Sequence, residues 1–143
     1  MKKQIQLCIL LALLSIFSHA AAVTANTGLP NEIIGSYWSP KKDAKIEIYM
    51  RGQLYFGTFI WVANPGKDIR NPVKALQGRG VLGIELLTGF AWSNGVYSGG
   101  EIYDPLTGKT YSCKLTLEGN KLKVRGYVGI SLFGRTEYFE RIQ

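Results

Sequence analysis

The chain has 143 residues and carries 17 Lys and Arg against 10 Asp and Glu, which gives a formal net charge of +7. No run of consecutive basic residues is longer than Lys41-Lys42, so the sequence shows no basic stripe along which a nucleic acid would bind. The excess positive charge is expected to form a scattered, solvated surface or to favour contact with an anionic envelope surface.

Residues 1–25 have the pattern of a bacterial secretory signal. Two lysines precede an apolar run over residues 5–17, and small residues follow up to Ala22 or Ala25. The run is too short, and its flanks are wrong, for a transmembrane anchor. We expect cleavage after Ala22 or Ala25, which would leave one domain over residues 26–143 in the periplasm or outside the cell.

Removal of this segment limits the chemistry that the protein can perform. The only histidine, His19, lies within it, and so does Cys8, so the mature chain has a single cysteine, Cys113. An internal disulfide is then impossible, and the usual nucleophile triads and zinc sites cannot be assembled. Cys113 alternates with Tyr111 and Leu115, which indicates a buried, unreactive thiol. We therefore expect no enzyme activity, no metal and no cofactor.

Short apolar or alternating segments, separated by Gly, Pro, Asn and Asp, predict an all-β chain. Residues 45–50 alternate apolar with charged side chains, as a half-buried strand does. Segment 81–92 is rich enough in Leu for a helix, but Gly83 and Gly89 would each cost about 1 kcal/mol there and suit a bent strand. The predicted strands are 34–38, 45–50, 54–62, 81–92, 95–104, 109–117, 121–130 and 134–142.

Eight short strands predict a closed barrel or a sandwich. Most of the connections, such as 51–53 and 118–120, are too short for a crossover, so an antiparallel up-and-down order is favoured. Closure into a barrel also removes the exposed sheet edges that invite aggregation.

The connection over residues 63–80 is long and polar and contains two prolines. A loop of this length is usually functional or partly ordered, and residues 73–76 could form one helical turn after Pro72. The loop is expected either to close one barrel end or to contact a ligand directly. Its candidate mouth residues are Trp61, Asn64, Asp68, Asn71 and Arg79.

The segment IYDPLTGKTY, residues 102–111, predicts a hairpin tip. Asp104 can accept backbone N–H bonds, Pro105 fixes the next φ angle, and Gly108 supplies a positive φ. A phosphate-binding loop would need a helix after Gly108-Lys109, whereas an alternating strand follows.

Several segments also resemble a known family. GGEIYDPLTGKTYSCKLTL and LKVRGYVGISLFGRTEYFER, preceded by DIRNP and RGVLGIELL, are similar to small exported bacterial proteins classed as domain of unknown function 2147. The resemblance covers nearly the whole mature chain. It implies a lipocalin-like barrel of eight to ten strands with an internal cavity.

Two departures from the family pattern concern the ends of the barrel domain. Where relatives have Gly-x-Trp in the first strand, this chain has GSYW, and Phe139 stands where relatives often have Trp. In lipocalin-like barrels an Arg of the last strand covers the first-strand aromatic ring. The resemblance therefore implies a structural contact of Arg141 with Tyr37 or Trp38.

Aromatic residues are more frequent in the predicted strands than one small core obviously needs, which suits a pocket for an amphipathic ligand. Glu101 is in phase with Tyr97, and Arg125 with Tyr127. If both faces point inward, Glu101 and Arg125 would form a buried ion pair; otherwise they face water. The candidate ligand-binding residues are Tyr97, Glu101, Tyr103, Tyr111, Arg125 and Tyr127.

These patterns support two functional hypotheses. The first is a carrier that binds a small hydrophobic or amphipathic molecule inside the barrel, with loop 63–80 at the mouth. The second is an envelope module with a filled barrel. It would bind a protein or polysaccharide through an outer patch formed by Trp61, Asn64, Asp68, Arg70 and Arg79.

Overall fold

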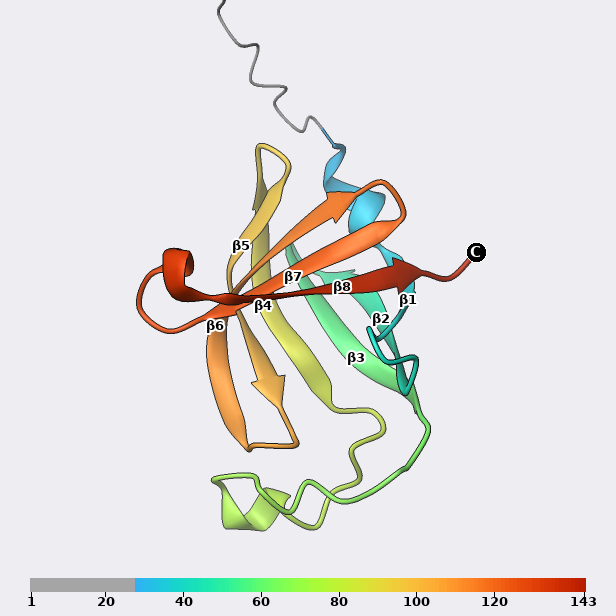
Figure 1. The fold of residues 1–143 in the computed structure, drawn as a ribbon, viewed down its shortest axis with the longest axis vertical. Helices are drawn as coiled ribbons and strands as arrows, with labels where there is room; N and C mark the ends of the chain where they lie inside the picture. The colour runs from blue at the N-terminus through green and yellow to red at the C-terminus, as the bar shows by residue number, and fades with distance from the viewer. Residues whose placement is uncertain (1–27) are drawn as a thin grey trace, which may run out of the picture.

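A computed structural model describes residues 28–143, so the predicted secretory signal lies outside the described residues. The chain forms a closed barrel of eight antiparallel strands in sequence order (Figure 1), which confirms the predicted all-β, up-and-down barrel. The strands are β1 (Gly35–Trp38), β2 (Ala44–Arg51), β3 (Leu54–Val62), β4 (Glu85–Ser93), β5 (Val96–Asp104), β6 (Lys109–Glu118), β7 (Lys121–Tyr127) and β8 (Arg135–Arg141).

Three 3₁₀ helices accompany the strands: η1 (Pro30–Ile33), η2 (Lys74–Leu76) and η3 (Ser131–Phe133). Helix η2 lies inside the segment where one turn was expected after Pro72. The predicted strand 121–130 ends earlier, at Tyr127, because the chain turns through Gly129 at φ 73°. None of the helices in residues 28–143 is long and apolar enough to cross a bilayer.

Up-and-down order places alternate connections at opposite ends of the barrel. Helix η1 and the turns β2–β3, β4–β5 and β6–β7 lie at one end, which we call the η1 end. The connections β1–β2, β3–β4, β5–β6 and β7–β8 lie at the other, which we call the loop end. Figure 1 shows η2 and the β5–β6 turn at the bottom and η3 at the left, away from η1.

The hairpin tip at residues 104–109 has the predicted geometry. The Leu106 N–H donates to Asp104 Oδ1 at 2.9 Å, and the Gly108 N–H donates to the Asp104 carbonyl oxygen at 2.8 Å. Gly108 has φ 70°, a left-handed conformation that favours glycine. The segment is therefore a turn, and its carboxylate is used within it.

The barrel interior is packed with side chains toward the η1 end. Ile46, Ile48, Phe90, Leu115 and Leu122 are at most 1% exposed. Burial of apolar surface of this kind is the main favourable contribution to folding. This part of the barrel is a filled core.

Candidate ligand-binding site

Buried tyrosines attach η1 to the barrel as a plug. The hydroxyl of Tyr37 donates to the Ile33 carbonyl oxygen at 2.7 Å, that of Tyr55 to Asn31 Oδ1 at 2.8 Å, and that of Tyr97 to the Pro30 carbonyl oxygen at 2.7 Å. The rings of Tyr55 and Tyr97 meet edge to face at a centroid distance of 5.0 Å. The hydroxyls thus satisfy polar groups of η1 inside an apolar core, as buried groups require.

Arg141 completes the closure of the η1 end. Its guanidinium carbon lies 4.9 Å from the ring centroid of Tyr37, and its amino groups donate to the Ile34 carbonyl at 3.0 Å, to the Glu32 carbonyl and to the Tyr37 hydroxyl at 2.5 Å. Burial raises the pKa of Tyr37 to about 12, although the Arg141 charge acts in the opposite direction. Of the two aromatic residues that the family resemblance offered, the structure places Arg141 over Tyr37.

Trp38 lies on the outer wall instead. Its ring meets Trp61 edge to face at 5.6 Å, and Lys45 Nζ lies 4.5 Å from the Trp38 centroid. Trp61, expected at the mouth, is therefore part of an outer aromatic pair. Lys45 was not among the predicted site residues, although strand alternation puts it on the outer face of β2 with Glu47.

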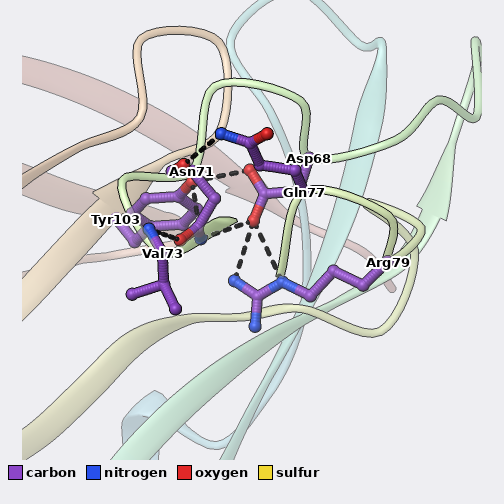
Figure 2. A network of polar contacts seen from close by, with 6 residues as sticks. All are labelled: Asp68, Asn71, Val73, Gln77, Arg79 and Tyr103. Atoms are coloured by element: carbon purple, nitrogen blue, oxygen red, sulfur yellow. Dashed lines mark hydrogen bonds and ion pairs between the residues drawn. The ribbon is translucent and has the colours of Figure 1, made fainter. Parts of the chain in front are cut away.

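The long β3–β4 loop, residues 63–84, is organised around Asp68, whose side chain is fully buried (Figure 2). Tyr103 donates its hydroxyl to Asp68 Oδ1 at 2.6 Å, Asn71 Nδ2 donates to Oδ2 at 2.8 Å, and Arg79 Nε donates to Oδ2 at 3.0 Å. Burial alone would raise the pKa of Asp68, but these hydrogen bonds and the Arg79 charge together lower it. The carboxylate is ionised and its oxygens are occupied by partners within the protein.

Asn71 extends this network to η2. Its Oδ1 accepts the Val73 N–H at 2.9 Å, and its carbonyl oxygen accepts from Gln77 Nε2 at 2.9 Å. Arg70, in the same segment, packs so closely on the β5–β6 turn that a Cβ at Gly108 would lie 1.8 Å from its carbonyl oxygen. The expected mouth residues Asp68, Asn71 and Arg79 thus hold the loop against the β5–β6 hairpin, while Asn64 is exposed.

A β-bulge separates the candidate ligand-binding residues of β5 into two faces. The register shifts between Tyr97 and Gly100, and Gly99 has φ 79°. Tyr97 therefore points into the core, whereas Glu101 and Tyr103 lie on the outer face. The expectation that Glu101 shares a face with Tyr97 was wrong, because strict alternation does not survive one extra residue.

Arg125 and Tyr127 also lie outside the barrel. Arg125 donates to the carbonyl oxygens of Ser131 at 2.7 Å and Leu132 at 3.0 Å, and to Thr136 Oγ1 at 2.7 Å, so it holds η3 in place. No ion pair with Glu101 forms, and Glu101 is exposed. Arg125 is paired with Lys114 of β6, and Glu101 with Ser112, so both residues lie on the outer face of the barrel. The inward orientation that the predicted ion pair required is therefore wrong.

Tyr111 is the candidate that faces the interior toward the loop end. It shares the inner face of β6 with Cys113, is paired with Ile102 of β5, and is half-buried. Among the described residues its hydroxyl has no hydrogen-bond partner and is not enclosed. The inner faces of β3 and β8 add half-buried Phe59 and Glu137. We call Phe59, Ile102, Tyr111 and Glu137 the mouth cluster.

The mouth cluster contains two apolar side chains, Phe59 and Ile102, and two side chains with a polar group, Tyr111 and Glu137. Glu137 accepts from Arg135 at 2.7 Å, and Arg135 is largely exposed. Of these four residues, only Tyr111 was predicted from the sequence as a site residue. The alternation of Tyr111 with buried Cys113 could have signalled the inner face of β6, but the register that brings Ile102 opposite Tyr111 depends on the bulge.

Other features offer less chemistry. Burial raises the pKa of the Cys113 thiol to about 12, which agrees with a buried, unreactive group. An open recess of about 480 Å³ lies at the end of the β3–β4 loop, where it is lined by Arg79 and by residues of the segment 80–85 that leads into β4. Within residues 28–143 no group of three or more His, Cys, Asp or Glu side chains is placed to hold a metal ion.

Comparison with solved structures finds a similar barrel. Protein HP1028 from Helicobacter pylori, described as belonging to the lipocalin family, superposes with a TM-score of 0.72 at 22% sequence identity, over 78% of this chain and 84% of that one. At this identity the similarity shows the fold. No curated protein matches the chain.

A family model for uncharacterized proteins conserved in bacteria matches residues 35–141, from the first residue of β1 to the last of β8. The matched region contains both the Asp68 network and Arg141. The chain therefore belongs to the DUF2147 family of bacterial proteins.

Proposed function

We propose that this protein binds a small hydrophobic or amphipathic molecule at the loop end of its barrel. A lipocalin-like fold suggests a non-enzymatic binding protein, but fold alone does not define a site. The observation that carries the proposal is the contrast inside the barrel. The interior is filled and closed by η1 at one end, whereas the inward-facing Phe59, Ile102 and Tyr111 are only partly buried toward the other.

The mouth cluster fits an amphipathic ligand. Ile102 and Phe59 offer apolar surface, and the Tyr111 hydroxyl can donate or accept one hydrogen bond without breaking one inside the protein. Glu137 and Arg135 lie at the rim, where a polar head group would remain in contact with water. The ligand would therefore lie against these side chains above the filled core, and not in a deep cavity.

Native mass spectrometry of protein taken directly from its own extract, without detergent, tests the proposal. We expect an added mass, and saturable uptake of fatty acids or phospholipids by the stripped protein. Tyr111→Ala should weaken uptake by about tenfold, since a hydrogen bond and apolar contact are both lost. Tyr127→Ala is the matched control, because Tyr127 is also half-buried but lies on the outer face. Absence of any saturable uptake would rule the proposal out.

Export to the periplasm or the medium is part of the proposal and is supported by the sequence of residues 1–25. Amino-terminal sequencing of the protein from a periplasmic extract should give Val23 or Asn26 as the first residue, according to whether cleavage follows Ala22 or Ala25. A start at Met1 in that extract would contradict it.

A second candidate function, an envelope module, is supported by the outer aromatic pair. Trp61 is 40% exposed, and Lys45 lies beside both tryptophan rings. Exposed aromatic rings beside a cation can bind a partner protein or a polysaccharide. Retention on envelope extract that disappears with Trp61→Ala, but persists with Tyr111→Ala, would favour this function over the first.

A further inference from the structure

We propose that the loop end of the barrel docks on the surface of an anionic lipid membrane. This goes beyond the proposed ligand site, because docking requires neither the mouth cluster nor a bound ligand. The docking face consists of exposed apolar side chains on several connections of the loop end, together with exposed basic residues of the β3–β4 loop.

The apolar side chains come from three separate connections. Leu132 and Phe133 of η3 are 74% and 81% exposed, Val128 before them is 77% exposed, Leu106 at the β5–β6 tip is 77% exposed, and Ile69 in the β3–β4 loop is 68% exposed. We call these five residues the apolar rim. Large side chains exposed to this degree on several connections of the loop end indicate an interaction surface.

The connections of the apolar rim are held rigidly, so their exposure is built into the fold. Arg125 holds η3 through hydrogen bonds to the carbonyl oxygens of Ser131 and Leu132. The Asp68 network holds the β3–β4 loop, and Arg70 packs on the β5–β6 turn. These hydrogen bonds are made within the protein, and the five apolar side chains are left exposed.

The positive charge of the β3–β4 loop favours an anionic lipid surface as the binding partner. The β3–β4 loop has four basic residues against one acid, and that acid, Asp68, is buried and paired. Lys67, Arg70 and Lys74 are exposed and have no ion-pair partner among the described residues. Anionic phospholipids attract basic residues that lie close to the bilayer, while apolar tips enter the interface.

A lipid surface fits better than one folded partner because the apolar rim is distributed over several projecting connections. A flat, fluid interface can take up separated side chains one by one, whereas a protein partner needs a continuous complementary surface. Docking in this orientation would bring the open mouth of the barrel to the bilayer.

Co-sedimentation with vesicles tests the proposal, with no ligand added. The purified protein should bind vesicles of phosphatidylglycerol and phosphatidylcholine, and should not bind phosphatidylcholine alone. Leu132→Asp should weaken binding by at least about fivefold, and Lys74→Glu by about fivefold or more. The matched controls carry the same changes at the η1 end, where Leu29 is 67% exposed and Lys121 is exposed: Leu29→Asp and Lys121→Glu should bind as the unchanged protein does.

Each other outcome overturns the proposal. Protein that stays in the supernatant with both vesicle types has no docking face, and equal losses for Leu132→Asp and Leu29→Asp would mean that no particular end is used. A dimer in solution that Leu132→Asp dissociates would make the apolar rim an interface between two copies. Tyr111→Ala should leave vesicle binding unchanged, so failure of the ligand proposal and failure of docking are distinguishable.

Discussion

The two ends of this barrel differ in the side chains that hold them and in those that they expose. The turns β4–β5 and β6–β7 at the η1 end are short and polar, and η1 is fixed there by buried tyrosine hydroxyls and Arg141. At the loop end the connections are longer, exposed apolar side chains gather on three of them, and a buried carboxylate organises the longest. At the η1 end, side chains close the barrel. At the loop end, buried polar groups hold the connections, and apolar side chains are exposed.

Among the changes to the groups that hold the two ends of the barrel, Asp68→Ala should have the largest effect, a loss of about 3 kcal/mol in the free energy of unfolding. Tyr103, Asn71 and Arg79 would each lose their acceptor. Chemical denaturation measures the loss. Glu101→Ala, on the exposed outer face, is the control and should stay within about 0.5 kcal/mol. Equal effects for the two variants would show that the loop end does not depend on its buried carboxylate.

Arg141→Ala should lower stability by about 2 kcal/mol, or the melting temperature by about 8 °C, because carbonyl oxygens of η1 and the Tyr37 hydroxyl lose a charged donor. Arg135→Ala is the matched control, because Arg135 lies at the loop end of the same strand, β8, and its side chain is 85% exposed. We expect no measurable change for Arg135→Ala. An unchanged melting temperature for Arg141→Ala would remove its role in closing the η1 end.

Acid should act on the loop end through Asp68. The pKa of Asp68 is lower in the folded protein than in the unfolded chain, where it is about 4. Its contribution to stability is therefore complete above that value and is lost as the pH falls through the folded pKa. Asp68→Asn should flatten the decline of stability below about pH 4. A parallel decline in both proteins, measured by denaturation at a series of pH values, would contradict this assignment.

Phe133→Ala should have the smallest effect on folding, within about 0.5 kcal/mol, because the side chain is 81% exposed. Phe90→Ala, at a fully buried position, should cost about 3 to 5 kcal/mol in the same thermal or chemical denaturation experiment. A large loss for Phe133→Ala would mean that the apolar rim stabilises the fold and is not a surface for a partner.

Much of the fold could be predicted from local pattern. Alternation and turn residues located all eight strands, and Asp104 with Gly108 predicted the β5–β6 turn. Two strands end or begin differently, because Gly129 and the segment before Glu85 belong to connections. Prediction of the candidate site was poorer, since a single bulge at Gly99 reverses the face of Glu101 and Tyr103 relative to Tyr97.

The sequence by itself determined the strands, their order and the position of the long loop, because alternation, turn chemistry and short connections act within a few residues. The tertiary structure alone decided which residues meet. Asp68 and Tyr103 are 35 residues apart in the chain, and Arg141 and Tyr37 are 104 apart. Barrel closure, the register of each pair of strands and one bulge set those contacts, and through them decided which tyrosines are core, which are outside and which lies at the open mouth.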